Sequence, residues 1–485
     1  MSSSDNESAI MSSSDNESET GWSQWWSETS GGESKADCIR RNDKSRKWVD
    51  IYDLESDAVE VLDALKNNTV VTSVTFHTVC SVQLKQEALD KLSEVMKCNK
   101  SVELLRISIE RGLPRERFFA AMATSGAWSS IQRLAIFYED DTDIEPLSIM
   151  DAEHISSFII QNQNLRSLSL QNTGFEIAPI VETLSRTKVQ SLMIGVGDNF
   201  SLQNGGRQLA TAFERCTCIT ELQLHFLDEV EVELEFFQIL LVESIPKMLG
   251  LKKFDLATHL QDQQFDQQFF DMVGQCIGGH QGEIEELTLG ISSSSSVNIS
   301  IVGLTPALRR LKVIQFDRDL SSQQIGELLG IVGDCDALEE FSCNMSQSTE
   351  SPGGISTDDF KAICQLLSKF PRLKRVTQDT LRSDEEVDLH EEDRLTAFLE
   401  MVKTSKTIEE VPSFLCGNAE EEAAIEYHCR NNMMHNRIYE EGLLAANVPN
   451  SVWPLILEEF SDMPDVLYYL LHQKHGAMIG PTRHG

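Results

Sequence analysis

The hexapeptide LRSLSL at residues 165–170, followed by VQSLMI at 189–194 and ITELQL at 219–224, decides how this chain folds. Each has apolar residues at its first, fourth and sixth positions, a pattern typical of a strand with one buried side. The pattern recurs along the chain and defines twelve candidate repeats, which begin at residues 71, 102, 131, 165, 189, 219, 251, 284, 308, 338, 373 and 408. The chain is therefore built from internal repeats.

The segments between these strands have helical periodicity. Leu89, Leu92, Val95 and Met96 share one helical face, and further along Ile155, Phe158 and Ile159 do the same. A strand with one apolar side and one amphipathic helix cannot bury its surface alone, so neighbouring repeats must stack. The sequence therefore predicts a curved parallel sheet backed by helices.

With this pattern the sequence resembles the leucine-rich-repeat family, of the ribonuclease-inhibitor-like type, over roughly residues 67–415. The resemblance implies an α/β fold, a horseshoe solenoid with a parallel concave sheet and convex helices. The repeats are degenerate, because the asparagine that the family places after the strand is present at Asn172 but mostly replaced elsewhere.

Three regions are predicted. Residues 1–46 are rich in Ser, Asp, Glu and Gly and form a disordered acidic tail, since they have too few apolar residues to offset ordering entropy. Residues 47–415 form the solenoid of about twelve repeats, with 47–66 a possible N-terminal cap. Residues 416–485, which include Trp453, form a helical C-terminal cap. The decapeptide at Met1 is nearly duplicated from Met11, which is either an alternative start or a slippage product.

Composition narrows the function classes. The chain has 41 Lys and Arg against 77 Asp and Glu, a net charge of −36. That charge repels nucleic acid and anionic membranes and favours basic partners. The sequence shows no basic segment followed by an apolar leader and no run of 18 apolar residues. The 11 cysteines lack the spacing of a disulfide framework, so we expect an intracellular protein of the cytoplasm or nucleus.

The search for catalytic motifs is negative. The sequence has no phosphate-binding GxxxxGK[ST] loop, no GxSxG elbow, no HExxH pair and no paired CxxC set. We interpret Cys216 and Cys218 as buried structural thiols and not as metal ligands. We therefore expect neither a metal nor a cofactor, and no enzymatic activity.

Stacking places equivalent residues of successive strands side by side, about 4.8 Å apart. In the second half the two residues after the first apolar position alternate in sign from repeat to repeat. They are Lys252 and Lys253, Glu285 and Glu286, Arg309 and Arg310, Glu339 and Glu340, Lys374 and Arg375, and Glu409 and Glu410. We interpret this alternation as a device that fixes register and neutralises that part of the concave face.

The first half has no such alternation. One column is predicted to carry Ser73, Arg106, Arg133, Ser167, Ser191 and Glu221, with Thr75, Ser169, Met193 and Gln223 one pleat further along, then Phe137 and His225. Unpaired arginines near an exposed aromatic ring are typical of protein interfaces. The predicted partner-binding residues are Arg106, Arg133, Phe137, Ser169, Met193 and Gln223.

Trp22, Trp25 and Trp26 cluster in the acidic tail, where no core is available to bury them. They are predicted either to form a linear docking motif or to fold back onto the solenoid.

We therefore expect a non-catalytic scaffold or adaptor that binds proteins on its concave face. Two alternatives stay open at this point. The chain could activate a small GTPase in the way of the Ran GTPase-activating family, which combines such repeats with acidic segments. It could also be a ubiquitin-ligase substrate adaptor, although no F-box segment is recognisable before the repeats.

Overall fold

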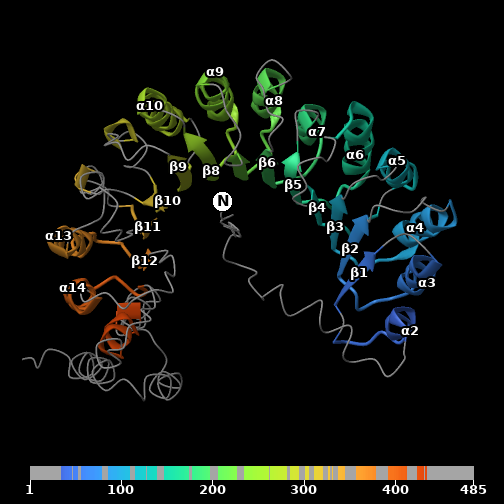
Figure 1. The fold of residues 1–485 in the computed structure, drawn as a ribbon, viewed down its shortest axis with the longest axis horizontal. Helices are drawn as coiled ribbons and strands as arrows, with labels where there is room; N and C mark the ends of the chain where they lie inside the picture. The colour runs from blue at the N-terminus through green and yellow to red at the C-terminus, as the bar shows by residue number, and fades with distance from the viewer. Residues whose placement is uncertain are drawn as a thin grey trace, which may run out of the picture. The chain divides into compact units, whose positions relative to one another are not determined.

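A computed structural model of the chain (Figure 1) describes most of residues 34–433. The segments outside the description are 1–33, 46, 53–55, 79–85, 110–114, 127, 139–146, 174–176, 197–205, 227–233, 261–262, 281–283, 294–300, 305–310, 320–325, 328–329, 331–336, 345–356, 378–390, 412–422, 431 and 434–485. The chain divides into two compact units, Met1–Ile131 and Gln132–Gly485, called here the N-terminal and C-terminal units.

The N-terminal unit alternates short helices with parallel strands. Its described elements are α2 (Lys35–Arg40), β1 (Trp48–Tyr52), α3 (Ser56–Leu65), β2 (Ser73–Thr78), α4 (Gln86–Cys98), β3 (Leu104–Ile109) and α5 (Arg115–Thr124). The pairing of β1 with β2 and of β2 with β3 is parallel and in chain order.

The C-terminal unit continues the same alternation. Its described strands are β4 (Arg133–Tyr138), β5 (Ser167–Thr173), β6 (Ser191–Val196), β7 (Glu221–Phe226), β8 (Lys253–Leu260), β9 (Glu286–Ser293), β10 (Val313–Asp319), β11 (Glu340–Asn344) and β12 (Arg375–Thr377). They lie in chain order, and each pairs in parallel with the next.

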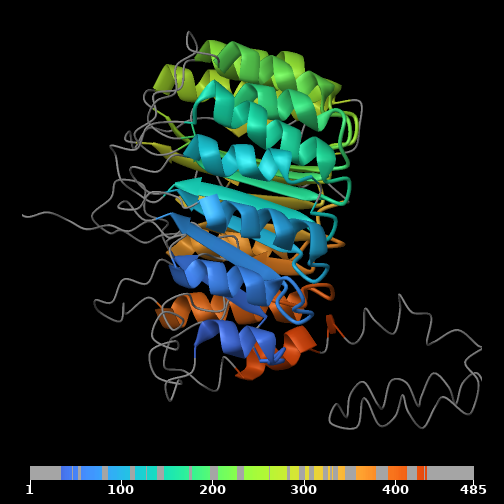
Figure 2. The same cartoon turned by 90° about the vertical axis from the view of Figure 1, so that its right-hand side faces the viewer.

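Helical segments lie between these strands. They are α6 (Ile149–Gln161), α7 (Ala178–Leu184), α8 (Gly206–Ala212), α9 (Leu234–Phe237), α10 (Gln263–Gly279), α13 (Thr357–Leu367) and α14 (Glu391–Thr404), with 3-10 turns η4 (Phe213–Arg215), η6 (Ile245–Lys247) and η7 (Ile301–Leu304) and a π-helical stretch η5 (Gln238–Ser244). Within the C-terminal unit the strands line the inner side and the helices the outer side (Figure 1). In each unit the helices are stacked in a row outside the strands (Figure 2).

The core of each unit lies between its strands and its helices. The strand residues at the fourth and sixth positions of the repeat point into it, as in β5, where Leu168 and Leu170 are fully buried. The helical residues predicted for this layer are buried as well, among them Leu92 and Phe158. Each such side chain contributes about 1.5–3 kcal/mol when it leaves water. The predicted fold class, an α/β leucine-rich-repeat solenoid with a parallel sheet and helices on its other side, is confirmed.

The predicted register is correct for every repeat but one. In the other repeats the strand, or the isolated bridge at Glu410, begins two residues after the predicted start. In the ninth repeat the strand begins at Val313, and Ile314 and Phe316 are the inward residues, at 0% and 1% exposure. The expected frame from residue 308 is therefore wrong by three residues. The segment LRRLKVIQF offers two apolar frames, and the correct one buries the larger Phe316 side chain.

The N-terminal boundary differs from the prediction. Helix α2 lies inside the segment expected to be disordered, and its Ala36, Cys38 and Ile39 side chains are buried. Ser34 caps this helix by accepting a hydrogen bond from the Asp37 backbone N–H. The first repeat therefore begins before residue 47, and only residues 1–33 and 46 of the predicted tail lie outside the description.

The described residues after the last strand fall partly in the segment predicted as a helical cap. Glu410 bridges Arg375 in parallel, and a helix follows at residues 423–430. Asn432 then donates to the carbonyl oxygens of Val402, Ser405 and Ile408 at 3.4, 3.1 and 2.8 Å. The described start of the predicted cap region is therefore helical, and Asn432 bonds it to the end of α14 and the residues that follow. Residues 434–485, including Trp453, lie outside the description.

The leucine-rich-repeat pattern places an asparagine after the strand, whereas the stabilising asparagine described here follows a helix. Asn99 follows α4, is 1% exposed, and donates to the carbonyls of Leu65 and Asn68 at 2.7 and 3.2 Å. Its Oδ1 accepts from the backbone N–H groups of Ser101 and Val102 at 3.0 and 2.9 Å. Buried backbone groups of two successive repeats are thus satisfied at the helix end, not after the strand.

Candidate protein-binding surface

Each described strand turns alternate side chains away from the helices, toward what we call the outward face. In the C-terminal unit these side chains form columns across neighbouring strands. The edge column holds the residue before each strand, and the first, middle and last columns hold its first, third and fifth residues. From β4 to β9 the middle column is Ala135, Ser169, Met193, Gln223, Asp255 and Thr288.

Three of the predicted partner-binding residues are neighbours in this middle column. Ser169 lies opposite Met193, and Met193 lies opposite Gln223. The Met193 sulfur accepts weak hydrogen bonds from Ser169 Oγ and Gln171 Nε2, both at 3.5 Å. The thioether is therefore held between two polar side chains and is partly open to solvent.

Arg133 and Phe137 come from β4, at the start of the C-terminal unit. Arg133 is exposed and lies opposite Ser167, and Phe137 lies opposite Gln171. Phe137 is half-buried and not exposed as the sequence suggested. Within the described residues Arg133 has no ion-pair partner.

Arg106 is placed differently from the prediction. It lies opposite Thr75 in the N-terminal unit, while Leu104 lies opposite Ser73. The expected column of Ser73, Arg106 and Arg133 is therefore wrong at Arg106, which is a middle-column residue. The sequence VELLRI has two adjacent leucines, so it does not show which of its residues point outward. Leu104 occupies an outward position that the pattern normally gives to a polar residue.

A histidine and a carboxylate meet on this face. His225 Nε2 lies 3.2 Å from Asp255 Oδ2, with side chains 19% and 22% exposed. The N-terminal unit repeats the arrangement with His77 Nε2 3.7 Å from Asp50 Oδ1. Sequence reasoning noticed His225 but missed Asp255. The register would have revealed it, because Asp255 lies opposite Gln223, two residues before His225.

The predicted alternation of charge on β8–β12 is present, but in the ninth repeat it involves other residues than those predicted. Register places Lys312 in the edge column beside Glu285 and Glu339, and Val313 in the first column beside Glu286 and Glu340. Arg309 and Arg310, which were predicted to fill these places, lie outside the described residues. The edge column alternates without a break, as Lys252, Glu285, Lys312, Glu339, Lys374 and Glu409.

Several of these charges form direct ion pairs across the strands. Lys312 Nζ lies 2.6 Å from Glu285, and Lys253 Nζ lies 2.7 Å from Glu286. Arg375 Nε donates to Glu340 at 2.8 Å. The hydrogen bond from Lys312 lowers the pKa of the Glu285 carboxyl, and the bond to Glu286 raises the pKa of Lys253. Glu285 and Lys253 are therefore both held in their charged forms at neutral pH.

The cysteines singled out in the sequence are engaged with backbone. Cys216 Sγ donates to the Val181 carbonyl at 3.4 Å, and Cys218 Sγ donates to the Leu184 carbonyl at 3.5 Å. Burial raises the pKa of the Cys216 thiol to about 12, so it is protonated at neutral pH. Across the described part of the chain, no group of three or more His, Cys, Asp or Glu side chains is placed to hold a metal ion. Nor does any described helix have the length and apolar character needed to cross a membrane.

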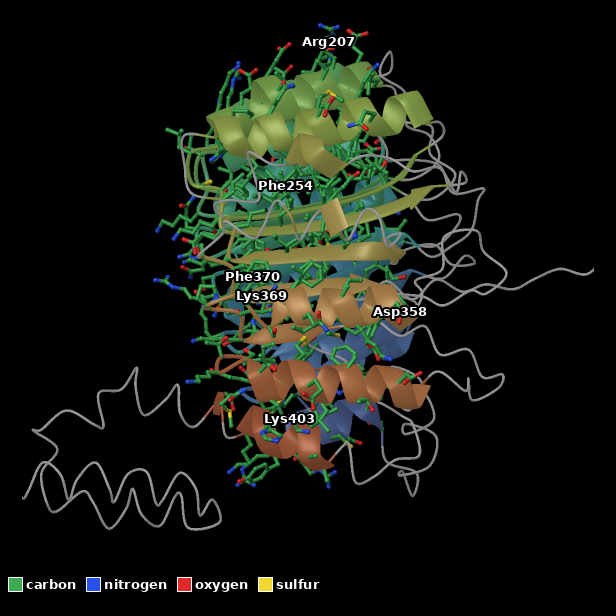
Figure 3. All side chains as sticks on the ribbon, turned by 90° about the vertical axis from the view of Figure 1, so that its left-hand side faces the viewer. Arg207, Phe254, Asp358, Lys369, Phe370 and Lys403 are labelled. Carbon is green, nitrogen blue, oxygen red and sulfur yellow. The ribbon has the colours of Figure 1, made fainter. Side chains whose placement is uncertain are left out.

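The tail tryptophans Trp22, Trp25 and Trp26 lie outside the described residues. The described geometry therefore defines one candidate surface in the C-terminal unit, formed by Arg133, Phe137, Ser169, Gln171, Met193 and Gln223. We call it the β4–β7 surface. On the opposite side of the unit, Arg207, which Figure 3 labels, pairs with Glu235.

The fold is that of a leucine-rich-repeat solenoid. No family model matches the sequence, and no curated protein matches it. Among solved structures, the chain is similar to the complex of Rad7 and Elc1 in yeast, at 13% identity and a TM-score of 0.37, over 80% of this chain and 85% of that one.

Two further solved structures share the likeness. The leucine-rich-repeat-containing protein LegL7 from Legionella pneumophila has 11% identity and a TM-score of 0.32, over 82% of this chain and 95% of that one. The tropomodulin C-terminal domain of Caenorhabditis elegans has 11% identity and a TM-score of 0.20, over 37% of this chain and 90% of that one. At these values the likeness bears on neither partner nor activity.

Proposed function

We propose that this chain is a non-catalytic scaffold or adaptor that binds a partner protein on the β4–β7 surface, in an intracellular compartment. One observation carries the proposal: Arg133 is exposed with no ion-pair partner among the described residues, on the same outward face as the half-buried Phe137 and Met193 side chains. Arginine, aromatic and methionine side chains are the types enriched at protein interfaces.

The charges of β8–β12 favour this location over the rest of the outward face. A partner that binds there must compete with ion pairs such as Lys312 with Glu285 and Arg375 with Glu340. On the β4–β7 surface it meets mainly hydroxyl, amide and thioether groups, which cost less to desolvate than paired charges. A contact of equal area should therefore give a more favourable binding free energy on the β4–β7 surface than on β8–β12.

The remaining parts of the proposal rest on smaller observations. Each full repeat combines one strand with one helix, as β5 follows α6, and this supports the ribonuclease-inhibitor-like subtype. The described cysteines Cys38, Cys98, Cys216, Cys218, Cys276, Cys364 and Cys429 are free thiols, which suits the cytoplasm or nucleus. The net charge of −36 disfavours nucleic acid and anionic membranes as partners.

A photo-crosslinking experiment tests the proposal. A photoreactive amino acid replaces Phe137 in one version of the full chain and Arg186, an exposed residue in the turn after α7, in a matched control. Irradiation in native lysate followed by mass spectrometry should give a partner crosslinked at 137 and not at 186. The same partner should be lost when Arg133→Glu is added.

The outcome decides between classes of protein. Equal crosslinking at both positions, or crosslinking at 137 that is indifferent to Arg133→Glu, would refute the proposed surface. A small GTPase or a ubiquitin-ligase subunit recovered at position 137 would assign one of the two narrower functions that the sequence left open.

A further inference from the structure

The alternation of charge on the outward face ends at β7 with a carboxylate that forms no ion pair among the described residues. Glu221 is the first residue of β7 and lies opposite Lys253 of β8. Lys253 Nζ lies 2.7 Å from Glu286 Oε2, on the far side of β8, and is therefore engaged by that carboxylate. On the other side of Glu221 is Ser191 of β6, which has no charge. The Glu221 side chain is partly exposed and can accept a cation.

A second carboxylate, on the neighbouring strand, is also open to a donor. Asp255 lies in the middle column of β8 between Gln223 and Thr288, and neither of these side chains is charged. Its Oδ2 lies 3.2 Å from His225 Nε2, but this Nε2 atom makes no hydrogen bond within the described part of the chain. The Asp255 side chain is 22% exposed. A donor that arrives from solvent can therefore bond to this carboxylate without displacing a described hydrogen bond.

The charges around Glu221 and Asp255 sum to a negative value. The first and middle columns of β7, β8 and β9 carry three carboxylates, Glu221, Asp255 and Glu286, against one cation, Lys253. Arg133 lies in the first column of β4, three strand spacings or about 14 Å from Glu221. Charges interact over about 8 Å at physiological salt, so Arg133 does little to repel a cation at Glu221. This part of the face therefore attracts a cationic side chain.

The sequence that follows each of the neighbouring strands adds negative charge. Parallel strands in register end at the same edge of a sheet, so the segments after β4, β5, β6 and β7 all begin at one edge of the outward face. These segments lie outside the described residues and have the sequences EDDTDIEP at 139–146, GFE at 174–176, GDNFSLQNG at 197–205 and LDEVEVE at 227–233. They contain eleven carboxylates and no Lys or Arg. A basic partner is therefore favoured over an acidic one.

The two carboxylates lie at a fixed spacing from an apolar contact. The middle column runs from Met193 of β6 through Gln223 of β7 to Asp255 of β8. Adjacent strands are about 4.8 Å apart, so the Met193 and Asp255 side chains start about 10 Å from each other. A partner that meets both needs an apolar and a cationic side chain at that spacing. An α-helix rises about 1.5 Å per residue, so residues seven apart lie on one face about 10.5 Å from each other.

We propose that the outward face of β6–β8 binds a helical segment of a partner protein, with an apolar side chain against Met193 and, seven residues along, an arginine between Glu221 and Asp255. This inference rests on the proposed function, because it names the chemistry of the partner for part of the same surface. Arginine suits the site better than lysine, since its guanidinium has five N–H donors in a fixed plane and can bond to two carboxylates at once.

Selection from a library of displayed α-helical peptides, randomised on one face, tests the proposal with the full chain. The enriched peptides should share an apolar residue followed seven positions later by arginine. Selection against the chain with Glu221→Gln and Asp255→Asn should lose this pattern, whereas selection against the chain with Glu153→Gln and Glu182→Gln should keep it. The control removes the same charge from exposed positions on α6 and α7, so it separates a defined contact from general attraction to an acidic protein.

The affinity of one enriched peptide then shows whether the contact is direct. Asp255→Asn should weaken its binding, measured by fluorescence anisotropy, about tenfold, or about 1.4 kcal/mol. A peptide with citrulline in place of the arginine has nearly the same shape without the charge and leaves the protein unaltered. It should bind the unmodified chain at least about tenfold more weakly, and Asp255→Asn should then cause little further loss, as expected for two groups in contact.

Three results would overturn the inference: a selection that enriches no such pattern, an equal loss of binding to the chain with Glu153→Gln and Glu182→Gln, or independent effects of Asp255→Asn and citrulline. If crosslinking of a partner at position 137 still depends on Arg133 in that case, the proposed function stands with a partner of other chemistry. If the peptides bind as expected while no partner crosslinks at position 137, the arginine site stands and the proposed function fails.

Discussion

The close contact of helix α10 with the 3-10 turn η7 gives a sharp test of the packing. Gly274 in α10 faces Gly303 in η7, and a Cβ added at Gly274 would lie 1.8 Å from the Gly303 carbonyl oxygen. Real Cβ atoms essentially never come within 3.0 Å of such an atom, so the backbone must move by at least 1.2 Å, the difference between the two distances. The obstacle is backbone, and no side-chain rotation can remove it.

Gly274→Ala should therefore destabilise the C-terminal unit. Overpacking of a well-packed contact costs about 1–3 kcal/mol. Alanine in place of glycine inside a helix returns up to about 1 kcal/mol, so the net loss is about 1–2 kcal/mol. Because a long repeat array need not unfold in two states, the measurement is hydrogen exchange of peptides from β9 (residues 286–293) and β10 (313–319), with urea unfolding as a second readout.

The matched control is in the same helix. Gly279 is the last residue of α10, and a Cβ added there meets nothing within 4 Å. Gly279→Ala should leave exchange in β9 and β10 unchanged or slow it slightly. If Gly274→Ala is as stable as Gly279→Ala, the contact between α10 and η7 is not as close as described, and the reasoning fails.

Three further predictions concern other parts of the fold. Asn99→Ala removes hydrogen bonds to four buried or partly buried backbone groups and should lower the free energy of unfolding in urea by about 2–4 kcal/mol. The control Lys97→Ala, on the exposed side of α4, should lower it by less than about 0.5 kcal/mol. Equal losses in the two variants would contradict the role of Asn99. Lys312→Glu places three carboxylates side by side and should lower the free energy of unfolding by about 0.5–1 kcal/mol at low salt, a loss that 1 M NaCl reduces. Because the pKa of Glu285 is lowered in the folded chain, the stability that its ion pair contributes is present above the ordinary carboxyl pKa near 4.3 and is lost as the pH falls below it. The free energies of unfolding of the variant and the unmodified chain should therefore converge in acid. Cys216, with its pKa raised to about 12, should resist iodoacetamide at pH 8 while the exposed Cys98 reacts, and rapid alkylation of Cys216 in mass spectrometry would show that the site opens.

The strands could be predicted because their signal is repeated and local. The fourth and sixth positions of each repeat must be apolar to enter the core, and the sequence meets this requirement in every repeat from β2 to β11, whereas the β12 repeat has Gln378 at its sixth position. The ninth repeat is informative: LRRLKVIQF satisfies the pattern from Leu308 and from Leu311. Only pairing with β9, which sets Val313 opposite Glu286, selects the second frame. Pairing is a property of two strands, so one hexapeptide cannot reveal it.

The two ends of the repeat region could not be predicted for a related reason. Strand β1, with the sequence WVDIY, lacks the leucine-rich pattern, and α2 is six residues long, too short to show a period. What includes them in the fold is tertiary contact, such as the bond from Asn68 Nδ2 to the Ile39 carbonyl at 2.6 Å. At the other end, the role of Asn432 depends on three carbonyls that lie 24 to 30 residues earlier.

The candidate surface was predictable in part. Ser169, Met193 and Gln223 were placed together correctly because a period of two within each strand fixes which side chains point outward. Arg106 was misplaced because Leu104 breaks that period, and Asp255 was missed because it contacts His225 diagonally across two strands. Errors thus arise where a neighbouring strand, and not the strand itself, determines what a side chain meets.

The position of the stabilising asparagines explains why this surface is open to variation. Asn99 joins successive repeats at the ends of the helices, where it satisfies backbone groups that would otherwise be buried without partners. The outward side chains of β5 and β6 satisfy no backbone group in this way: Ser169 and Gln171 bond to the Met193 sulfur, which is a weak acceptor. Their replacement should cost little stability, within about 0.5 kcal/mol. Loss of a partner in a Ser169→Ala or Gln223→Ala chain would therefore report on recognition and not on folding.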